Sequence, residues 1–262
     1  MMKKGMSFDT IKEVAPSVFT ETSSPETSNM YTHIPTYKVI EDMEKLNWYV
    51  DDVKEIKARK GIGFQKHMVI FRNDDIYIKA EDGDDVFPQI LLINSHNGKS
   101  SFSFQAGLFR LICSNGLVIS TQDFGSMKIR HMGYSFKELQ QLISSVVDKM
   151  PLVVESMNKF REKQLNQDEQ FKFVMEAIGL RFGDEQIEVS PEEILKPERE
   201  KDKGDDLWVV YNRVQEKLTQ GTFNYTIRKK ETNKTRKARK IKNFQQDIVL
   251  NKKLYELAES FT

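Results

Sequence analysis

The chain has 262 residues, 39% of them hydrophobic and 30% charged, and its 40 basic and 39 acidic side chains give a net charge of +1. A chain of this length and composition can bury a core, which excludes a fully disordered protein, and the near-zero net charge excludes a polycation. The single cysteine, Cys113, excludes an internal disulfide framework and a zinc site built from several cysteines.

Residues 1–34 predict a flexible leader. Within them, residues 20–30 (TETSSPETSNM) are rich in Thr, Ser, Pro and Glu, which cannot bury enough apolar surface to hold one conformation. The first residues lack the apolar core of a signal peptide, and no apolar run approaches the roughly 18 residues needed to cross a membrane. We therefore expect a cytoplasmic protein that has no membrane partner.

Residues 35–182 predict one α+β core domain. A helix is expected after Thr36, because apolar residues then recur at helical spacing on one face. From Trp48 to Phe124 apolar residues instead recur two apart within short segments, which is typical of strands, and Asn-Gly at 97–98 is a strong hairpin signal. We predict an antiparallel β-sheet meander of five or six strands, followed by packed helices.

The helices of this domain carry recognisable start and stop signals. Ser135 and Glu138 match a capping box, in which the serine oxygen accepts a free N–H and the glutamate reaches back. The helix that begins there should continue past Pro151 with a bend. A second helix is expected over about 167–181, with Gly183 as its stop.

Residues 183–206 predict an acidic connector, and residues 207–262 predict C-terminal helices. The connector carries ten acidic and four basic residues, a net charge of −6, which is typical of a solvated segment. Ser190 is placed to cap one short helix inside it. Apolar residues from Leu207 to Leu218 then mark one face of an amphipathic helix that Gly221 ends.

The segment 228–242 (RKKETNKTRKARKIK) concentrates positive charge, with one acidic residue, Glu231, and a net charge of +8. Its basic residues are Arg228, Lys229, Lys230, Lys234, Arg236, Lys237, Arg239, Lys240 and Lys242. Such a density of like charge favours a polyphosphate partner, because neutralised phosphates release counterions. Nearby Phe223 and Tyr225 could stack on bases. A solvated face or tail, or a partner for the acidic connector, explains the same charges.

Two further sets of residues give weaker signals. Lys57 and Arg59 would share one face of a strand, which suits either a nucleic-acid groove or a solvated sheet face. The four histidines, His33, His67, His96 and His131, contain no pair spaced as helical metal ligands, so we expect isolated histidines. The sequence indicates no catalytic constellation, no metal site and no cofactor.

Residues 110–117 (RLICSNGL) resemble the R-x-x-C-x-N-G signature of a phage- and plasmid-borne family of unknown function. The segment 207–216 (LWVVYNRVQE) is similar to the aromatic–Tyr–Asn–x–Val–Thr–Glu helix of the same family, with Gln215 in place of the threonine. The resemblance spans about residues 35–220. Its motif residues, which also fit a purely structural role, are Arg110, Cys113, Asn115, Gly116, Trp208, Tyr211, Asn212 and Glu216. The chemistry of these residues allows a structural interpretation of each. Asn115-Gly116 predicts a tight turn, because both residues tolerate a positive φ. Cys113 fits a crowded interior, and Glu216 is a candidate carboxylate partner for Arg110.

The resemblance implies a protein of a mobile element in a bacterial host, with no known reaction. A sheet meander packed on helices also resembles, at fold level, the phage annealing proteins of the Redβ and RecT type. Together with the basic segment, this favours a nucleic-acid-binding protein that holds single-stranded DNA, with annealing in recombination or replication as one role. The alternatives are a non-enzymatic interaction protein, such as a host-takeover or virion-associated factor, and a metal-dependent nuclease. Open sheet edges and the annealing analogy lead us to expect a homo-oligomer.

Overall fold

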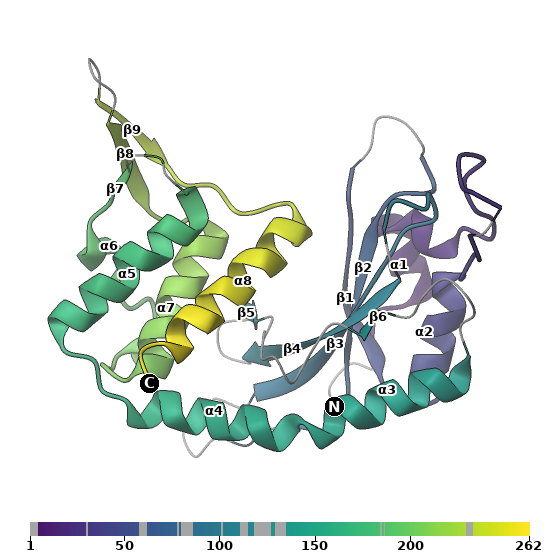
Figure 1. The fold of residues 1–262 in the computed structure, drawn as a ribbon, viewed down its shortest axis with the longest axis horizontal. Helices are drawn as coiled ribbons and strands as arrows, with labels where there is room; N and C mark the ends of the chain where they lie inside the picture. Colours follow the sequence, from purple (N-terminus) through teal and green to yellow (C-terminus); the bar gives the residue numbers. More distant parts are fainter. Residues whose placement is uncertain are drawn as a thin grey trace. The chain divides into compact units, whose positions relative to one another are not determined.

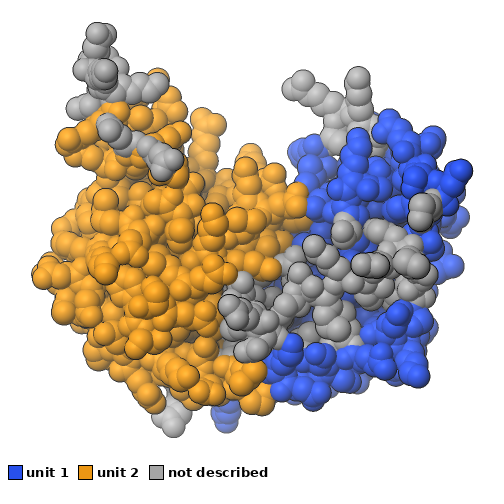
Figure 2. Space-filling view, viewed as in Figure 1, with its two compact units in different colours: residues 1–118, 122–150 blue, residues 119–121, 151–262 orange. Residues whose placement is uncertain are grey.

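The computed structural model describes residues 5–29, 31–57, 62–77, 79, 86–100, 102–110, 115–117, 127–128, 135–183, 185, 187–228 and 233–262. The chain divides into two compact units, coloured separately in Figure 2: residues 1–118 with 122–150, and residues 119–121 with 151–262. The division between residues 150 and 151 falls inside the segment 35–182 that the sequence indicated as one core domain. The described elements are helices and antiparallel sheets, which confirms the α+β fold class.

The first unit is built on a six-stranded antiparallel sheet (Figure 1). Its strands are β1 (Tyr49–Glu55), β2 (His67–Arg72), β3 (Val86–Asn94), β4 (Ser103–Arg110), β5 (Asn115–Leu117) and β6 (Met127–Lys128). Strands β1 to β5 follow one another in sequence order, and β6 pairs with the start of β4. The predicted meander is therefore confirmed. Gly98, with φ +70°, lies in the turn between β3 and β4, where the Asn-Gly signal predicted a hairpin.

Helices cover one face of this sheet. They are α1 (Phe8–Val14), the 3₁₀ helix η1 (Pro16–Phe19), α2 (Thr36–Glu44) and α3 (Phe136–Asp148). Their apolar residues join one core with alternate residues of the strands, among them Phe71, Leu92 and Phe104. Alternate residues point to the same face of a strand, so the period-two pattern of the sequence selects the side chains that form this core.

The N-terminal segment is more ordered than a flexible leader. Ile11 of α1 and Val18 of η1 are fully buried in the core, and Ser7 caps α1 by accepting a hydrogen bond from the N–H of Thr10. The expectation for residues 1–34 rested on the polar stretch 20–30, whereas the apolar residues that anchor the segment precede it.

The prediction of a tight turn at Asn115-Gly116 is wrong. Both residues lie in β5, where Asn115 pairs with Arg110 and Gly116 pairs with Phe109 of β4. Asn-Gly favours turns because both residues tolerate a positive φ, but that tolerance does not forbid an extended backbone when a neighbouring strand supplies ladder hydrogen bonds.

The second unit is mainly helical. Its helices are α4 (Met150–Glu162), α5 (Gln167–Phe182), α6 (Pro191–Leu195), the 3₁₀ helix η3 (Glu200–Asp202), α7 (Leu207–Gln220) and α8 (Phe244–Glu259). A three-stranded antiparallel sheet joins them, in the order β7 (Ile187–Glu188), β8 (Asn224–Arg228) and β9 (Asn233–Lys237). Among the described residues, no helix has the length and apolar character needed to cross a membrane.

The expected helix signals are confirmed. Ser135 and Glu138 form the capping box of α3, and Ser190 caps α6. Gly183 ends α5 with φ +67°, and Gly221 ends α7 with φ +72°. Instead of one bent helix at Pro151, the chain forms two helices, α3 and α4, because proline fits the first turn of a helix but not its interior.

Helix α7 is the central element of the second unit. Eleven of its residues are buried, including Leu207, Trp208, Tyr211 and Leu218. The acidic residues 183–206 do not lie apart from this helix: Ile194 of α6 is fully buried, and Asp202 is 3% exposed. The segment predicted as a solvated connector therefore packs on the second unit.

Candidate functional site

The basic segment supplies the last residue of strand β8 and all of strand β9, which pair with each other in the small sheet (Figure 1). Strand β8 lies between β7 and β9, so β9 is an edge strand of the small sheet. Arg228 ends β8, whereas Lys234, Arg236 and Lys237 lie on β9. Lys229 and Lys230 lie outside the described residues.

Six basic side chains on this part of the chain are exposed, and we call them the basic surface: Lys234, Arg236, Lys237, Arg239, Lys240 and Lys242. Within the described part of the chain none of the six forms an ion pair. Arg228 differs, because its guanidinium pairs with Glu188 of β7. The acidic connector thus meets the basic segment at one described ion pair, and the basic surface remains open to solvent.

The backbone beneath the basic surface is held firmly. The N–H of Ala238 donates to the carbonyl of Phe223 at 2.8 Å, and the N–H of Ile241 donates to the carbonyl of Thr219 at 2.9 Å. Arg181 of α5 also donates a 2.7 Å hydrogen bond to the carbonyl oxygen of Arg239. Exposed cations on a fixed backbone can contact a partner without an additional cost of ordering the main chain.

Only one of the two aromatic residues beside this segment is accessible. Phe223 is 1% exposed, so the expectation that it could stack on bases is wrong. Tyr225 is half-buried and pairs directly with Arg236 across β8 and β9, which places both side chains on one face of the hairpin. Its ring centroid lies 4.8 Å from that of Phe182.

The weaker candidate, Lys57 with Arg59, is not a strand face in the described residues. Strand β1 ends at Glu55, and Lys57 follows it as an exposed residue without strand structure. Arg59 lies outside the described residues. The pair therefore adds no described element to the candidate site.

Three of the four histidines come together, which corrects the expectation of isolated residues. The ring centroids of His33 and His96 lie 4.6 Å apart, and those of His67 and His96 lie 5.3 Å apart. His67 and His96 are fully buried in the first unit. Despite this gathering, no set of three His, Cys, Asp or Glu side chains in the described ranges is arranged to hold a metal ion.

His67 is held as a neutral ring. Its Nδ1 lies 3.0 Å from the carbonyl oxygen of Gln65, which can only accept, so Nδ1 carries the proton. Its Nε2 then accepts from the hydroxyl of Thr36 at 2.8 Å, and Thr36 Oγ1 accepts in turn from Asn94. Burial lowers the pKa of His67 from 6.5 to about 4. Ser17 Oγ lies 2.8 Å from Nδ1, but a protonated Nδ1 cannot take its proton, so this pair does not make a nucleophile.

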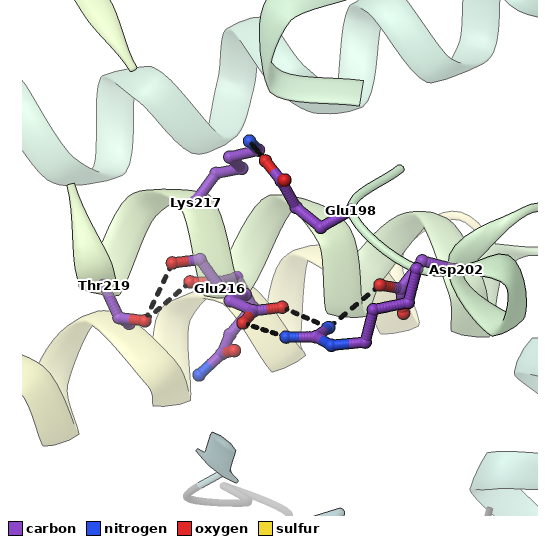
Figure 3. A network of polar contacts seen from close by, with 7 residues as sticks. Glu198, Asp202, Glu216, Lys217 and Thr219 are labelled. Atoms are coloured by element: carbon purple, nitrogen blue, oxygen red, sulfur yellow. Dashed lines mark hydrogen bonds and ion pairs between the residues drawn. The ribbon is translucent and has the colours of Figure 1, made fainter. Parts of the chain in front are cut away.

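The residues of the α7 motif lie in the second unit. Trp208, Tyr211 and Asn212 are at most 3% exposed. Glu216 pairs with Arg199 inside the second unit, and its suggested pairing with Arg110 stays a prediction, because the Arg110 side chain lies outside the described residues. Arg199 donates to both carboxylate oxygens of Glu216, at 2.6 and 2.9 Å, and also donates to Asp202 at 2.9 Å (Figure 3).

The motif at residues 110–117 is described only in part. Cys113 and the side chain of Arg110 lie outside the described residues, whereas Asn115 and Gly116 lie in β5.

Comparison with known proteins identifies a family. A family model described as a domain of unknown function (DUF932) matches residues 26–255. Two proteins of Escherichia coli strain K12, UPF0380 protein YafZ and UPF0380 protein YfjQ, are each 30% identical over 249 residues, which is 94% of this chain and 88% of each relative. No solved structure matches the chain. The chain belongs to the DUF932 family, which confirms the expected membership of a family of unknown function.

Proposed function

We propose that this DUF932 chain binds nucleic acid, with single-stranded DNA as the preferred form, through the basic surface of its second unit. The observation that supports the proposal is a set of six exposed cations without an ion-pair partner among the described residues, on a backbone fixed by hydrogen bonds. Phosphate is the partner for such a set, because each neutralised phosphate releases a condensed counterion.

A charged edge strand also has a structural use, since lysines there prevent pairing with a second chain. That use explains Lys234 and Lys237 on β9. It does not explain Arg239, Lys240 and Lys242, which continue the charge beyond the strand, where there is no ladder edge to protect. The continuation favours a phosphate backbone as the partner.

The preference for a single strand rests on Tyr225. Its half-buried ring shares one face of the hairpin with the guanidinium of Arg236. A base can stack on such a ring only when it is not already stacked within a duplex, and the neighbouring arginine can hold the phosphate of the same nucleotide. Replacement of Tyr225 by leucine should therefore weaken binding to single strands more than binding to duplexes.

The test is fluorescence anisotropy with labelled single-stranded DNA, duplex DNA and RNA at several salt concentrations. The variant Lys237→Gln, Arg239→Gln, Lys240→Gln removes three charges from the basic surface. It should weaken binding about equally for all sequences, because phosphate contacts carry no base information. It should also flatten the salt slope for single strands by about 2, given roughly 0.7 per phosphate contact. The matched control, Lys159→Gln, Lys172→Gln, Lys253→Gln, removes three exposed lysines of the same unit that lie elsewhere.

The outcomes separate the proposal from its alternatives. An unchanged affinity and salt slope in the first triple variant would contradict the proposal, and absence of any binding would favour a non-enzymatic interaction protein. Cleavage of DNA in the presence of magnesium would favour a nuclease.

The finer parts of the proposal concern biological setting. We propose a phage- or plasmid-related protein that acts in the cytoplasm of a bacterial host as a homo-oligomer and anneals complementary strands during recombination or replication. The support is the signature at residues 110–117 and the resemblance of a helix-packed meander to annealing proteins. Light scattering at tens of micromolar should show an oligomer, and mixing of complementary strands should show faster duplex formation with the protein.

A further inference from the structure

One side of helix α7 lines a cavity with three charged residues and a glutamine. Arg213, Glu216, Lys217 and Gln220 are spaced three and four apart, which places them on the same side of the helix. Residues 196–202 pass over this side, and between them lies a cavity of about 420 Å³. Its lining residues are Lys196, Glu198, Arg199, Asp202, Arg213, Glu216, Lys217, Gln220 and Thr222. This volume lies within the range of small-molecule sites.

The ion pairs around the cavity differ in how firmly they are held. Arg199 bridges Glu216 and Asp202, whose side chains are 21% and 4% exposed, so this part is a fixed wall. Lys217 pairs with Glu198, but Lys217 is 7% exposed at its side chain and Glu198 is 55% exposed (Figure 3). A buried ammonium is therefore covered by a carboxylate that is itself largely in solvent, so another anion can take the place of this carboxylate and keep the ammonium paired.

Arg213 supplies a second buried cation. It is 9% exposed, and one of its terminal nitrogens donates to the carbonyl of Gly204 at 2.8 Å. Its Nε is buried without a hydrogen-bond partner among the described residues. The buried guanidinium of Arg213 therefore adds a second fixed positive charge to the lining of the cavity.

We propose that this cavity binds a phosphate monoester, which displaces Glu198 from Lys217 and is attracted by the buried cations Lys217 and Arg213. The proposal does not rest on the function proposed for the basic surface. The lining holds four basic and three acidic side chains. When Glu198 swings out, four cations face two carboxylates, an excess of two positive charges. A phosphate monoester, which is close to a dianion at neutral pH, balances this excess better than a single carboxylate does.

Two sources could supply the phosphate, a free nucleotide or the 5′ end of a nucleic-acid strand. Titration calorimetry with AMP, with inorganic phosphate and with adenosine tests the first source. Comparison of a 5′-phosphorylated with a 5′-hydroxyl oligothymidine tests the second. AMP should bind and adenosine should not, because adenosine lacks the phosphate. If the 5′ end of a strand supplies the phosphate, the 5′-phosphorylated oligothymidine should bind more tightly than the 5′-hydroxyl form.

The decisive variant is Glu198→Gln, which removes the exposed competitor and should not unfold the protein. It should bind AMP about tenfold more tightly than the wild type, because one opposing negative charge is lost at close range. The matched control is Glu200→Gln, which removes an exposed acid of the same segment that pairs with Lys203 and does not line the cavity. It should bind AMP as the wild type does. Arg213→Met should lose at least tenfold in affinity.

The proposal is overturned if neither the wild type nor Glu198→Gln binds AMP or inorganic phosphate at 10 mM. It is also overturned if Glu200→Gln changes the affinity as much as Glu198→Gln does. The triple variant of the basic surface should bind AMP normally. If that variant loses oligonucleotide binding but still binds AMP, the basic surface and the cavity beside α7 are separate sites.

Discussion

Acidification should destabilise the first unit through His67. The ring is fully buried and both of its nitrogens are satisfied in the neutral form, with Nδ1 near Gln65 and Nε2 near Thr36. Burial lowers its pKa from 6.5 to about 4. Between these two values the unfolded chain binds a proton that the folded chain excludes, so stability falls as the pH falls.

The size of the effect follows from the shift in pKa. A pKa change from 6.5 to about 4 lowers the free energy of unfolding by about 3 kcal/mol once the pH is below 4, because each pKa unit corresponds to about 1.4 kcal/mol. Between pH 7 and pH 5 the free energy of unfolding should drop by about 2 kcal/mol from this residue alone. His33 should add a smaller loss of the same sign, because burial lowers its pKa as well.

Urea unfolding at pH 7 and pH 5 measures this loss in the wild type, in His67→Gln and in the control His33→Gln. His67→Gln should be less stable at pH 7, because it loses packing and hydrogen bonds, but its drop between the two pH values should be about 2 kcal/mol smaller. If His67→Gln does not fold, the NMR titration of the wild-type ring replaces it. Equal drops in all three proteins, or a ring that titrates near 6.5, would refute the reasoning.

Three further changes test the second unit by urea unfolding. Gly221→Ala should lose about 3 kcal/mol, since φ is +72° and the new Cβ would lie 2.3 Å from the carbonyl carbon of Arg239; a loss below about 0.5 kcal/mol would contradict this. Asn166→Ala should lose about 1 kcal/mol by removing the capping box of α5, and an unchanged midpoint would show that the cap is dispensable. Glu216→Ala and Arg199→Ala should show a coupling energy of about 1 kcal/mol in a double-mutant cycle, whereas additive effects would show that the bidentate contact adds nothing.

Local features of the fold followed from the sequence because local physics determines them. The period-two segments became strands, and α7 ended at Gly221 because a left-handed residue at a helix end favours glycine. Ser135 and Ser190 capped their helices as expected, since a cap needs only a side-chain oxygen and an N–H three residues away. The charge density of 228–242 was also visible in the sequence alone, although its division into a hairpin strand and a following loop was not.

The features that only the tertiary structure decided depend on residues far apart in the chain. His33, His67 and His96 meet because α2 packs on the sheet, and no spacing in the sequence indicates that contact. Glu216 is held by Arg199, a residue that the acidic composition of its segment had assigned to solvent. Phe223 is buried although it adjoins the most charged part of the chain. Such pairings are chosen by which surfaces exclude water together, a property of the folded chain and not of any one segment.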